Sequence, residues 1–498
     1  MEIRKAAISI AMEVHLNTTL IIDNDAVNSE GGTVFERRHP VTDGLVTTGA
    51  AASVKDAFRA AESSARAFQS WSQTGPTERR RILLKAADIL ETKVGIFSEV
   101  MAKEIGASGL WSGFNVMASA AVMREAAAIA TQIQGETIPT DKPNTLSMTL
   151  RQPVGVVLSI VPWNGPVILA TRAIAYPLVC GNTVVFRASE TSPRTHELLA
   201  EAFYEAGLPP GVLNFITNAP DQASEIINSL IAHPAVRRVN FTGSTRVGRI
   251  VAQECAKHLK RCLLELGGKS PLVILDDADI DGAVNAAIFG SFLYQGQICM
   301  STERIVVDNK IADEFVAKFV ERANSLQMAD PTESPGCVIG PMVSKNSGVR
   351  VNGLIADAIG KGAHIVAGGN ADGALMPATI VDNVTPDMQI YDEETFGPIT
   401  TIVRVKDIEE AVRSANDTAY GLSAAVFGRD VTRAFNVARR LDSGSVHING
   451  ATVQDEPQAP YGGMKNSGYG RFGGRAVIHE FTELKWITIE PSSQPYPI

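Results

Sequence analysis

Cys299 and Glu265 are the two residues whose types and surroundings best suit covalent catalysis. Cys299 follows a glycine-containing turn and has polar neighbours, where a thiolate can form and be reached. Glu265 stands where an apolar strand gives way to Gly267-Gly268, and partial desolvation there would suit a general base. A strand, an acidic turn and a helix are expected between them, so one cleft can receive both. Taken singly, Glu265 is also explained as an exposed turn residue and Cys299 as an ordinary thiol.

The other four cysteines fit structural positions. Three lie in apolar stretches as small buried residues and the fourth lies in a loop, namely Cys180, Cys255, Cys262 and Cys337. Five cysteines without CxxC spacing argue against disulfides and zinc, and they predict a reducing, cytoplasmic setting. The acidic run Asp277–Gly282 resembles a calcium loop, but Ile288 at its twelfth position cannot supply the bidentate carboxylate. We therefore expect no metal site.

The strand–helix junction Phe241–Gly248 is suited to a phosphate. Gly243 permits a tight turn, while Ser244 and Thr245 can cap the helix and direct N–H groups at an anion. The junction lacks the GxGxxG fingerprint, and a plain strand–helix turn explains it equally well.

Two further strand ends carry side chains with possible roles. Glu190 could accept both hydroxyls of an adenine ribose, whereas Arg187 beside it could accommodate a 2′-phosphate. A surface ion pair is the alternative. The Asn164 amide could donate to a developing oxyanion, although an Asn-Gly turn that caps a helix explains Asn164 and Gly165 as well.

Strand-like and helix-like segments alternate from Val154 to Phe241, which predicts a parallel sheet with helices on its faces. The expected strands are 154–161, 183–186, 212–216 and 236–241, and the expected helices are 166–179, 193–206 and 223–231. A second α/β pattern runs from Pro271 to about Val446, with strands at 271–275, 305–307, 399–405 and 424–427 and a helix at 280–294.

Three amphipathic helices are expected before these segments, over 54–69, 77–105 and 112–134, because apolar residues recur with a helical period. Thr137–Gln152 and the tail Glu483–Ile489 alternate like exposed strands. These two segments predict an arm that joins subunits into a homodimer, with a tetramer as the alternative.

The bulk properties exclude several classes of protein. A chain of 498 residues is too long for one core and predicts about three domains. Its net charge of −9 does not favour nucleic-acid binding. The sequence has no run of about 18 apolar residues, so we expect no membrane span. The apolar run of Met1–Ala11 is too short for a signal peptide.

Taken together, these segments resemble the NAD(P)-dependent aldehyde dehydrogenase family over nearly the whole chain from about Thr33. The motifs that carry the resemblance are Pro162–Asn164, Phe241–Thr245, Leu264–Lys269, Gly296–Cys299 and Glu393–Pro398. The resemblance implies an α/β fold of two domains with mostly parallel sheets and a small β arm for oligomerisation. It implies an NAD-binding domain at 1–136 and 153–265, a thiol domain at 266–470, and an arm and tail at 137–152 and 471–498.

The resemblance also implies a reaction. Cys299 would attack an aldehyde carbon to give a thiohemiacetal, whose oxyanion the Asn164 amide and the Cys299 N–H would hold. A hydride would pass to the nicotinamide, and Glu265 would activate the water that hydrolyses the thioester. Glu394 would hold the nicotinamide ribose and Phe396 would pack beside the nicotinamide. The expected cofactor contacts are Ile160, Pro162, Trp163, Arg187, Glu190, Gly243, Ser244, Thr245, Val247, Gly248, Leu266, Glu394 and Phe396.

Two positions depart from the family pattern. Many members carry Lys where this chain has Arg187, a departure that leaves NADP as the alternative to the expected cofactor NAD. Some members carry a carboxylate where this chain has Phe472, so a second proton relay is not expected.

Pro177–Asn182, Gln297–Arg304 and Ala459–Gly463 are similar to members that oxidise aromatic aldehydes. Salicylaldehyde is the expected substrate, in the degradation of aromatic hydrocarbons such as naphthalene. Benzaldehyde, vanillin or a broad range of aldehydes are the alternatives. We hypothesise that Arg172, two helical turns after Asn164, contacts the phenolic oxygen; the alternative is an exposed surface residue. The hypothetical aromatic pocket consists of Trp111, Gly165, Arg172 and Ile298.

Three other functions use some of the same features. A CoA-acylating enzyme would not keep the hydrolytic base Glu265. A cysteine hydrolase needs a histidine partner, and none of the eight histidines lies in these motifs. A structural protein that retains the fold would not need Cys299, Glu265 and Asn164 together.

Overall fold

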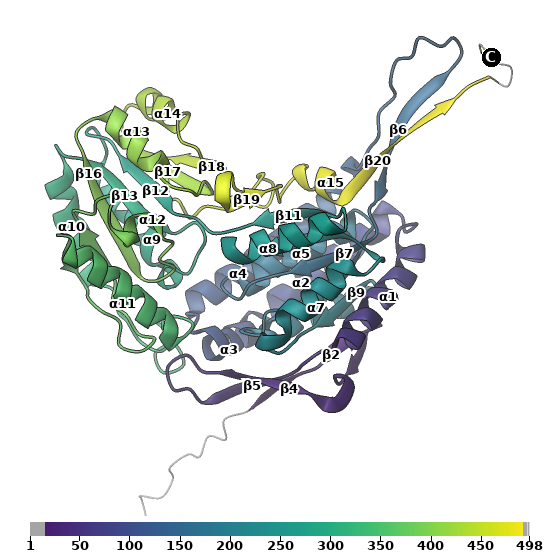
Figure 1. The fold of residues 1–498 in the computed structure, drawn as a ribbon, viewed down its shortest axis with the longest axis horizontal. Helices are drawn as coiled ribbons and strands as arrows, with labels where there is room; N and C mark the ends of the chain where they lie inside the picture. Colours follow the sequence, from purple (N-terminus) through teal and green to yellow (C-terminus); the bar gives the residue numbers. More distant parts are fainter. Residues whose placement is uncertain (1–14, 492–495, 497) are drawn as a thin grey trace, which may run out of the picture.

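A computed structural model describes residues 15–491, 496 and 498. Two large sheets dominate the molecule, and helices cover both faces of each (Figure 1). The prediction about Met1–Ala11 lies outside the described residues.

The first sheet has eight strands in the order β19-β11-β10-β7-β8-β9-β2-β3. Its central strands β11 to β9 are parallel, and antiparallel strands close both edges. The strands are β2 (Leu20–Ile22), β3 (Asp25–Val27), β7 (Val156–Ile160), β8 (Thr183–Arg187), β9 (Leu213–Ile216), β10 (Val236–Thr242), β11 (Arg261–Glu265) and β19 (Gly468–Tyr469). The predicted α/β alternation is confirmed, but the edge strands β2 and β3 precede the segment in which we recognised the family.

Helices α2 to α6 cover one face of this sheet, and α1, α7 and α8 cover the other. Their bounds are α1 (Val54–Trp71), α2 (Pro76–Thr92), α3 (Val94–Ile105), α4 (Gly109–Ile129), α5 (Pro166–Val179), α6 (Pro193–Glu205), α7 (Ala223–Ala232) and α8 (Thr245–Lys257). Ser53 and Asp56 form a reciprocal capping box at the start of α1. Every residue of α5 is buried, because α5 lies between the sheet and α4.

The single helix predicted over 77–105 is wrong, because the structure has two helices there. Lys93 interrupts them with φ −101° and ψ 8°. The Thr92 hydroxyl donates to the Ile89 carbonyl at 2.7 Å, a local bond that competes with helix continuation. The apolar residues of α2 and α3 face the same core, so their spacing does not reveal the break.

The second sheet has seven strands in the order β14-β15-β16-β13-β12-β17-β18, and all pairs except β14–β15 are parallel. The strands are β12 (Ser270–Ile274), β13 (Thr302–Asp308), β14 (His364–Ala367), β15 (Thr379–Asp382), β16 (Ile399–Val405), β17 (Ser423–Phe427) and β18 (Ser445–Ile448). The helices are α9 (Ile280–Phe292), α10 (Ala312–Asn324), α11 (Lys345–Gly360), α12 (Gln389–Asp392), α13 (Ile408–Asn416) and α14 (Val431–Ala438). A smaller sheet contains β1 (Leu16–Thr18), β4 (Val34–Arg38) and β5 (Leu45–Ala50).

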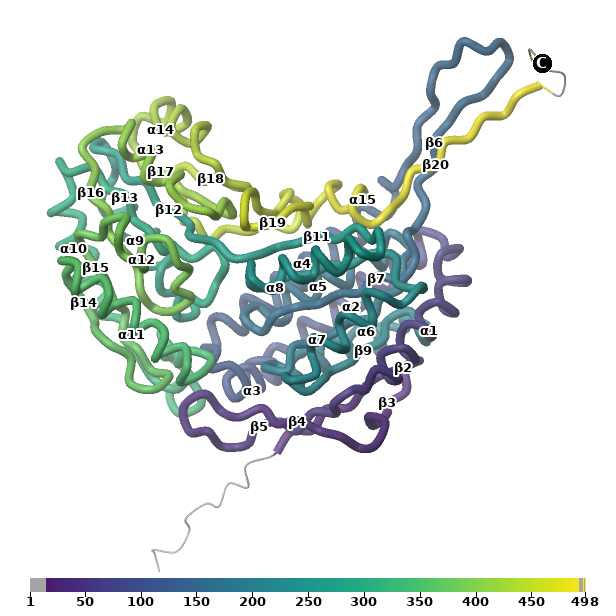
Figure 2. The backbone as a smooth tube through the Cα atoms, in the orientation of Figure 1, coloured from purple at the N-terminus to yellow at the C-terminus, as the bar shows by residue number. Residues whose placement is uncertain are grey.

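The two segments predicted to be extended form a ribbon that projects from the body (Figures 1 and 2). β6 (Leu146–Pro153) pairs antiparallel with β20 (Thr482–Ile489), which follows α15 (Ala476–Phe481). Both strands are confirmed, and they pair with each other within one chain. Nothing in either segment alone could indicate that partner.

The chain crosses between the two sheets at the place where the candidate catalytic residues lie. Residues 266–269 connect β11 directly to β12, and the segment after β18 returns to the first sheet at β19, as the yellow part of the tube shows (Figure 2). Gly468 and Tyr469 therefore pair with β11, although we expected them in the thiol domain. Residues at this boundary can contact side chains from both sheets.

Candidate active site

Glu265 and Cys299 meet because their elements end at the boundary between the sheets. Glu265 is the last residue of β11 and is 1% exposed. Cys299 lies between the 3-10 turn η4 (Leu293–Gly296) and β13. A Cβ at Gly268 would lie 2.4 Å from the Cys299 carbonyl oxygen, so only glycine permits this close approach of the two segments.

The turn before Cys299 has an unusual backbone. Tyr294, Gln295 and Gly296 have φ values of 50°, 53° and 66°, so the helix predicted to Tyr294 ends at Phe292. Stacking of Tyr294 on Trp111, with ring centroids 4.9 Å apart, holds the strained turn. The Gln295 side-chain amide also donates to two backbone carbonyls, at 2.9 and 3.2 Å. The thiol is thus presented on a rigid loop.

The hydroxyl of Tyr461 lies between the thiol and the carboxylate. It is 3.1 Å from Cys299 Sγ and donates to Glu265 Oε1 at 3.2 Å. Two backbone hydrogen bonds of 2.8 Å between Tyr461 and Phe472 fix its position. We did not predict Tyr461 as a site residue, since its only sequence signal was membership of the segment 459–463.

Burial determines the acid–base properties of this trio. It raises the pKa of Glu265 to about 7, near that of a useful general base. Burial first, and then the Glu265 charge, raise the pKa of the Cys299 thiol well above its usual range. The thiol is therefore protonated at neutral pH and needs a base. The polar neighbours in the sequence had suggested instead that a thiolate forms readily.

Asn164 lies beside the thiol, where an oxyanion donor is needed. Its Nδ2 donates to the Gln297 carbonyl at 3.0 Å, and the second hydrogen of that amide remains available to a ligand. Its backbone carbonyl accepts a hydrogen bond of 2.9 Å from Trp111 Nε1. Trp111 and Gln297 thus orient Asn164 from two sides.

A cavity of about 290 Å³ opens at the thiol and extends between the sheets. Ten of its lining residues were predicted, namely Pro162, Trp163, Asn164, Gly243, Ser244, Glu265, Leu266, Cys299, Glu394 and Phe396. Leu169, Thr242, Gly267 and Arg350 also line it and were not predicted. Arg350 has no local motif, and it enters the site because its guanidinium donates to the Glu394 and Thr395 carbonyls.

The junction between β10 and α8 forms one wall of the cavity, which Thr242, Gly243 and Ser244 line. The Ser244 hydroxyl caps the helix by accepting from Val247 N at 3.4 Å. A Cβ at Gly248 would lie 2.4 Å from the Leu266 side chain, so glycine lets α8 pack closely against Leu266. Thr245, Val247 and Gly248 belong to the first turn of α8 and do not line the cavity.

Glu394 and Phe396 form the opposite wall. Glu394 Oε1 accepts from Gly268 N at 3.0 Å, and burial raises the pKa of its carboxyl to about 8. Phe396 has φ 45° and meets Trp163 edge to face, with ring centroids 5.8 Å apart. These side chains are arranged to contact one end of an elongated ligand.

The buried residue Glu303 holds this wall in place. It accepts from Thr395 N at 2.7 Å, from Phe396 N at 3.0 Å and from Lys269 Nζ at 2.8 Å. Sequence reasoning missed Glu303, because inside a strand nothing distinguishes it from any other buried carboxylate.

Arg187 and Glu190 lie at the end of β8, away from the thiol cavity. Glu190 Oε2 accepts from Arg187 Nη2 at 2.7 Å, and Arg187 Nε donates to Asn218 Oδ1 at 2.7 Å. Ile160 is buried and pairs with Arg187 across β7 and β8. Arg187 and Glu190 do form an ion pair. The alternative of a surface ion pair is nevertheless wrong for Arg187, which is 6% exposed.

Arg172 is 4% exposed, so the alternative of an exposed surface residue is wrong. Its guanidinium forms an ion pair with Asp455 and lies 4.6 Å from the centroid of the Tyr461 ring. The four residues of the predicted substrate pocket, Trp111, Gly165, Arg172 and Ile298, do not line the cavity. Trp111 instead contacts Asn164, and Arg172 contacts the ring of Tyr461.

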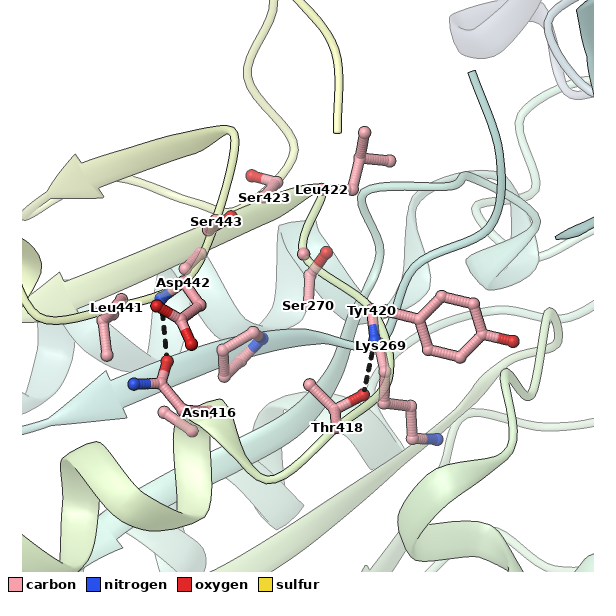
Figure 3. Close-up of a pocket in the computed structure, with 14 residues that line it drawn as sticks. Lys269, Ser270, Asn416, Thr418, Tyr420, Leu422, Ser423, Leu441, Asp442 and Ser443 are labelled. Atoms are coloured by element: carbon pink, nitrogen blue, oxygen red, sulfur yellow. Dashed lines mark hydrogen bonds between the residues drawn. The ribbon is translucent and has the colours of Figure 1, made fainter. Parts of the chain in front are cut away.

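A second, smaller cavity lies between the starts of β12 and β17 (Figure 3). Lys269, Tyr420 and Leu422 are among its lining residues, and its volume is about 10 Å³. This is room for about one water molecule and excludes a dinucleotide or an aromatic substrate. The cavity at the thiol is therefore the candidate site, because Cys299, Glu265 and Asn164 line it.

Two kinds of feature are absent from residues 15–491. No three histidine, cysteine, aspartate or glutamate side chains cluster as a metal site would require. None of the helices there combines the length and the apolar character that a membrane span needs.

A model of the aldehyde dehydrogenase family matches residues 26–487. The chain belongs to this family. The predicted family and fold are thereby confirmed, and the aldehyde dehydrogenase described here oxidises aldehydes. Members of the family use NAD(P) as cofactor.

Curated relatives cover almost all of this aldehyde dehydrogenase. A salicylaldehyde dehydrogenase of Pseudomonas sp. (strain C18) is 65% identical over 97% of this chain and 100% of its own. A vanillin dehydrogenase of Pseudomonas fluorescens is 51% identical, again over 97% and 100%.

Solved structures agree with this assignment. The crystal structure of a salicylaldehyde dehydrogenase from Pseudomonas putida G7, complexed with salicylaldehyde, has a TM-score of 0.96 and 64% identity over 97% of this chain and 100% of its own. PnpE, crystallised in complex with NAD, has a TM-score of 0.92 and 34% identity over 96% and 99%.

Proposed function

We propose that this aldehyde dehydrogenase oxidises salicylaldehyde to salicylate with NAD, in the degradation of aromatic hydrocarbons. The observation that carries the proposal is a thiol, a phenol and a buried carboxylate in contact, beside an amide donor and a cavity between two α/β sheets. The similarity to salicylaldehyde dehydrogenases supports the choice of substrate.

The proposed chemistry begins at Cys299. The Cys299 thiolate attacks the aldehyde carbon, and the free hydrogen of Asn164 Nδ2 together with the Cys299 N–H stabilises the oxyanion. NAD, when bound, would accept the hydride that the thiohemiacetal carbon loses as the thioester forms. Glu265, with a pKa of about 7, then takes a proton from water as the water attacks the thioester.

The residues present fit a dinucleotide. The start of α8 follows the cavity residues Gly243 and Ser244, so its first backbone N–H groups can bind a pyrophosphate there, while Glu394 and Phe396 line the same cavity as Cys299. Glu190 compensates the charge of Arg187, and its carboxylate would repel a 2′-phosphate. This arrangement supports NAD over NADP.

The role proposed for Arg172 changes with its contacts. Its guanidinium is engaged by Asp455 and stacks on Tyr461, so we propose that it positions the Tyr461 ring. Trp111 positions Asn164 in a similar way, while Ile298 and Gly165 adjoin the two catalytic residues in the chain.

Initial rates with a panel of aldehydes test the proposal. With NAD and without CoA, salicylaldehyde should give a higher kcat/KM than benzaldehyde, vanillin or an aliphatic aldehyde, measured as NADH absorbance. Cys299→Ser should remove NADH formation while the protein stays folded by circular dichroism. In Arg172→Leu, kcat/KM should fall for every aldehyde, since Tyr461 is released.

The results distinguish the alternatives. A preference for vanillin would transfer the assignment to that substrate, since a vanillin dehydrogenase is 51% identical to this chain. No NADH from any aromatic aldehyde would favour a structural protein with this fold.

Other features extend the proposal to the assembly and its setting. We propose a homodimer, because the β6–β20 ribbon exposes Leu146, Leu150 and Ile489 on one face. All five cysteines are free, which fits the reducing cytoplasm. We further propose that the first sheet carries the NAD-binding domain and the second sheet the thiol domain.

A further inference from the structure

We propose that Tyr461 is a catalytic residue, which passes the proton of the Cys299 thiol to Glu265 and then stabilises the thiolate. This inference rests on the proposed function, because it assigns the step that generates the nucleophile. It concerns a phenol that the sequence motifs did not single out. The contacts of its hydroxyl on both sides carry the argument.

The hydrogen-bond directions define a path for the proton. A tyrosine hydroxyl has one hydrogen, and at Tyr461 that hydrogen is donated to Glu265 Oε1. We therefore assign the thiol hydrogen to the 3.1 Å contact between Cys299 and Tyr461, with the phenolic oxygen as acceptor. The order is S–H to phenol to carboxylate.

The transfer balances without any further reactant. The S–H bond of Cys299 breaks as its proton binds the phenolic oxygen of Tyr461. The phenolic hydrogen moves to Glu265, so the products are a thiolate, an intact phenol and a carboxylic acid. The phenol now donates its new hydrogen to the thiolate, a bond to a charged group in a buried site.

The surroundings suit a fixed relay. Tyr461 is 6% exposed and its backbone is held by Phe472, so the hydroxyl cannot swing away into solvent. The Arg172 guanidinium stacks on its ring and favours negative charge on the phenol and its neighbours. Burial holds the pKa of Tyr461 well above its usual range, so the phenol transfers protons without remaining ionised.

Tyr461→Phe, which removes only the hydroxyl, tests the relay. The readout is the rate at which iodoacetamide alkylates Cys299, followed by peptide mass spectrometry from about pH 6 to about pH 10. In the native protein the rate should rise as the pH passes about 7, when Glu265 loses its proton. Tyr461→Phe should lower the rate by about tenfold or more at pH 7–8. Its rate should approach the native rate only where the thiol ionises by itself.

Matched variants separate the relay from a structural effect. Tyr469→Phe removes another phenol, 3.0 Å from Cys262 Sγ, and should leave the Cys299 profile unchanged. Tyr461→Phe should slow alkylation much less in a Glu265→Gln background than in the native protein, because both changes interrupt one proton path and only the donor to the thiolate is still lost.

The relay is overturned if Tyr461→Phe alkylates Cys299 with the native rate and pH profile. That result would mean that Cys299 and Glu265, which also interact directly, exchange the proton without the phenol. If the variant does not fold, a proton inventory of native alkylation decides, since a relay moves two protons and a linear inventory contradicts it. The alkylation assay needs no aldehyde, so failure of the proposed substrate would be seen separately.

Discussion

Burial determines the chemistry of the individual residues in this site. Glu265, Cys299 and Tyr461 all have pKa values raised by desolvation, yet only Glu265 reaches a value near neutrality. A carboxyl that titrates near 7 can accept a proton from a thiol and later from water. The same desolvation makes the ionised carboxylate costly to the folded protein.

Replacement of Glu265 by glutamine should stabilise the protein at alkaline pH. The folded pKa of about 7 lies above the unfolded value of 4.5, so the folded state holds the proton more tightly. Native stability therefore falls as the pH rises from about 4.5 to about 7 and stays lower above that range. Glu265→Gln, which never ionises, should be more stable at pH 8 by up to about 3 kcal/mol.

Thermal unfolding at pH 8 and at pH 5 measures this effect. The gain in Tm should shrink at pH 5, where the native carboxyl is mostly protonated when folded. An equal Tm gain at both pH values would show that shape, and not charge, is responsible.

At the scale of elements, the cavity wall that carries Glu394 and Phe396 is a loop anchored from a strand of the second sheet. Glu303 on β13 accepts two backbone N–H groups of the loop and the ammonium of Lys269. The Lys269–Glu303 pair has both side chains within 3% exposure, so removing one charge leaves the other buried and uncompensated. The position of Glu394 and Phe396 therefore depends on a residue that does not itself line the cavity at the thiol.

Glu303→Gln should weaken both the fold and cofactor binding. We expect a loss of about 2–4 kcal/mol in the free energy of unfolding, because Lys269 loses its buried partner. We also expect a higher KM for NAD, with little change in the KM for the aldehyde, because the loop that carries Glu394 is released. Denaturant unfolding and initial rates measure the two effects.

Glu314→Gln is the matched control. Glu314 pairs with Lys318 at 3.1 Å on the exposed face of α10, where a single ion pair contributes at most about 1 kcal/mol. Equal destabilisation in both variants, or an unchanged KM for NAD in Glu303→Gln, would contradict the anchoring role.

For the whole molecule, the arm is the feature that a single chain does not explain. A two-stranded ribbon is marginally stable by itself, and this one carries apolar side chains outward. Leu146 lies opposite Ile489, and Met148 opposite Ile487, on the same face. Contact with a second copy of the chain would remove this face from water.

The double substitution Leu146→Lys and Ile489→Lys should disrupt the proposed dimer. Light scattering after size-exclusion chromatography should give twice 53.1 kDa for the native protein and a mass near 53.1 kDa for the double variant. Thr488→Lys, on the other face of β20, should leave the native mass unchanged. A native protein of single-chain mass, or a double variant that stays dimeric, would contradict the proposed interface.

The sequence by itself determined the family, the strand–helix alternation and the pairing of Cys299 with Glu265. These depend on local patterns, in which neighbouring residues carry the period of an element or the turn that ends it. The break at Lys93 escaped this reasoning, because both helices keep one apolar face toward the same core.

Only the tertiary structure decided which residues connect the proposed catalytic pair. Tyr461 and Glu265 are 196 positions apart in the chain. Glu303 accepts hydrogen bonds from residues that lie 92 and 93 positions further along the chain. No local pattern specifies such contacts, since they arise from the way two sheets pack at their boundary. Burial, which raises the pKa of Glu265 and protonates the thiol, is likewise a property of the packed molecule. The proposed nucleophile can therefore be recognised in the sequence, and the proposed path of its proton can be recognised only in the fold.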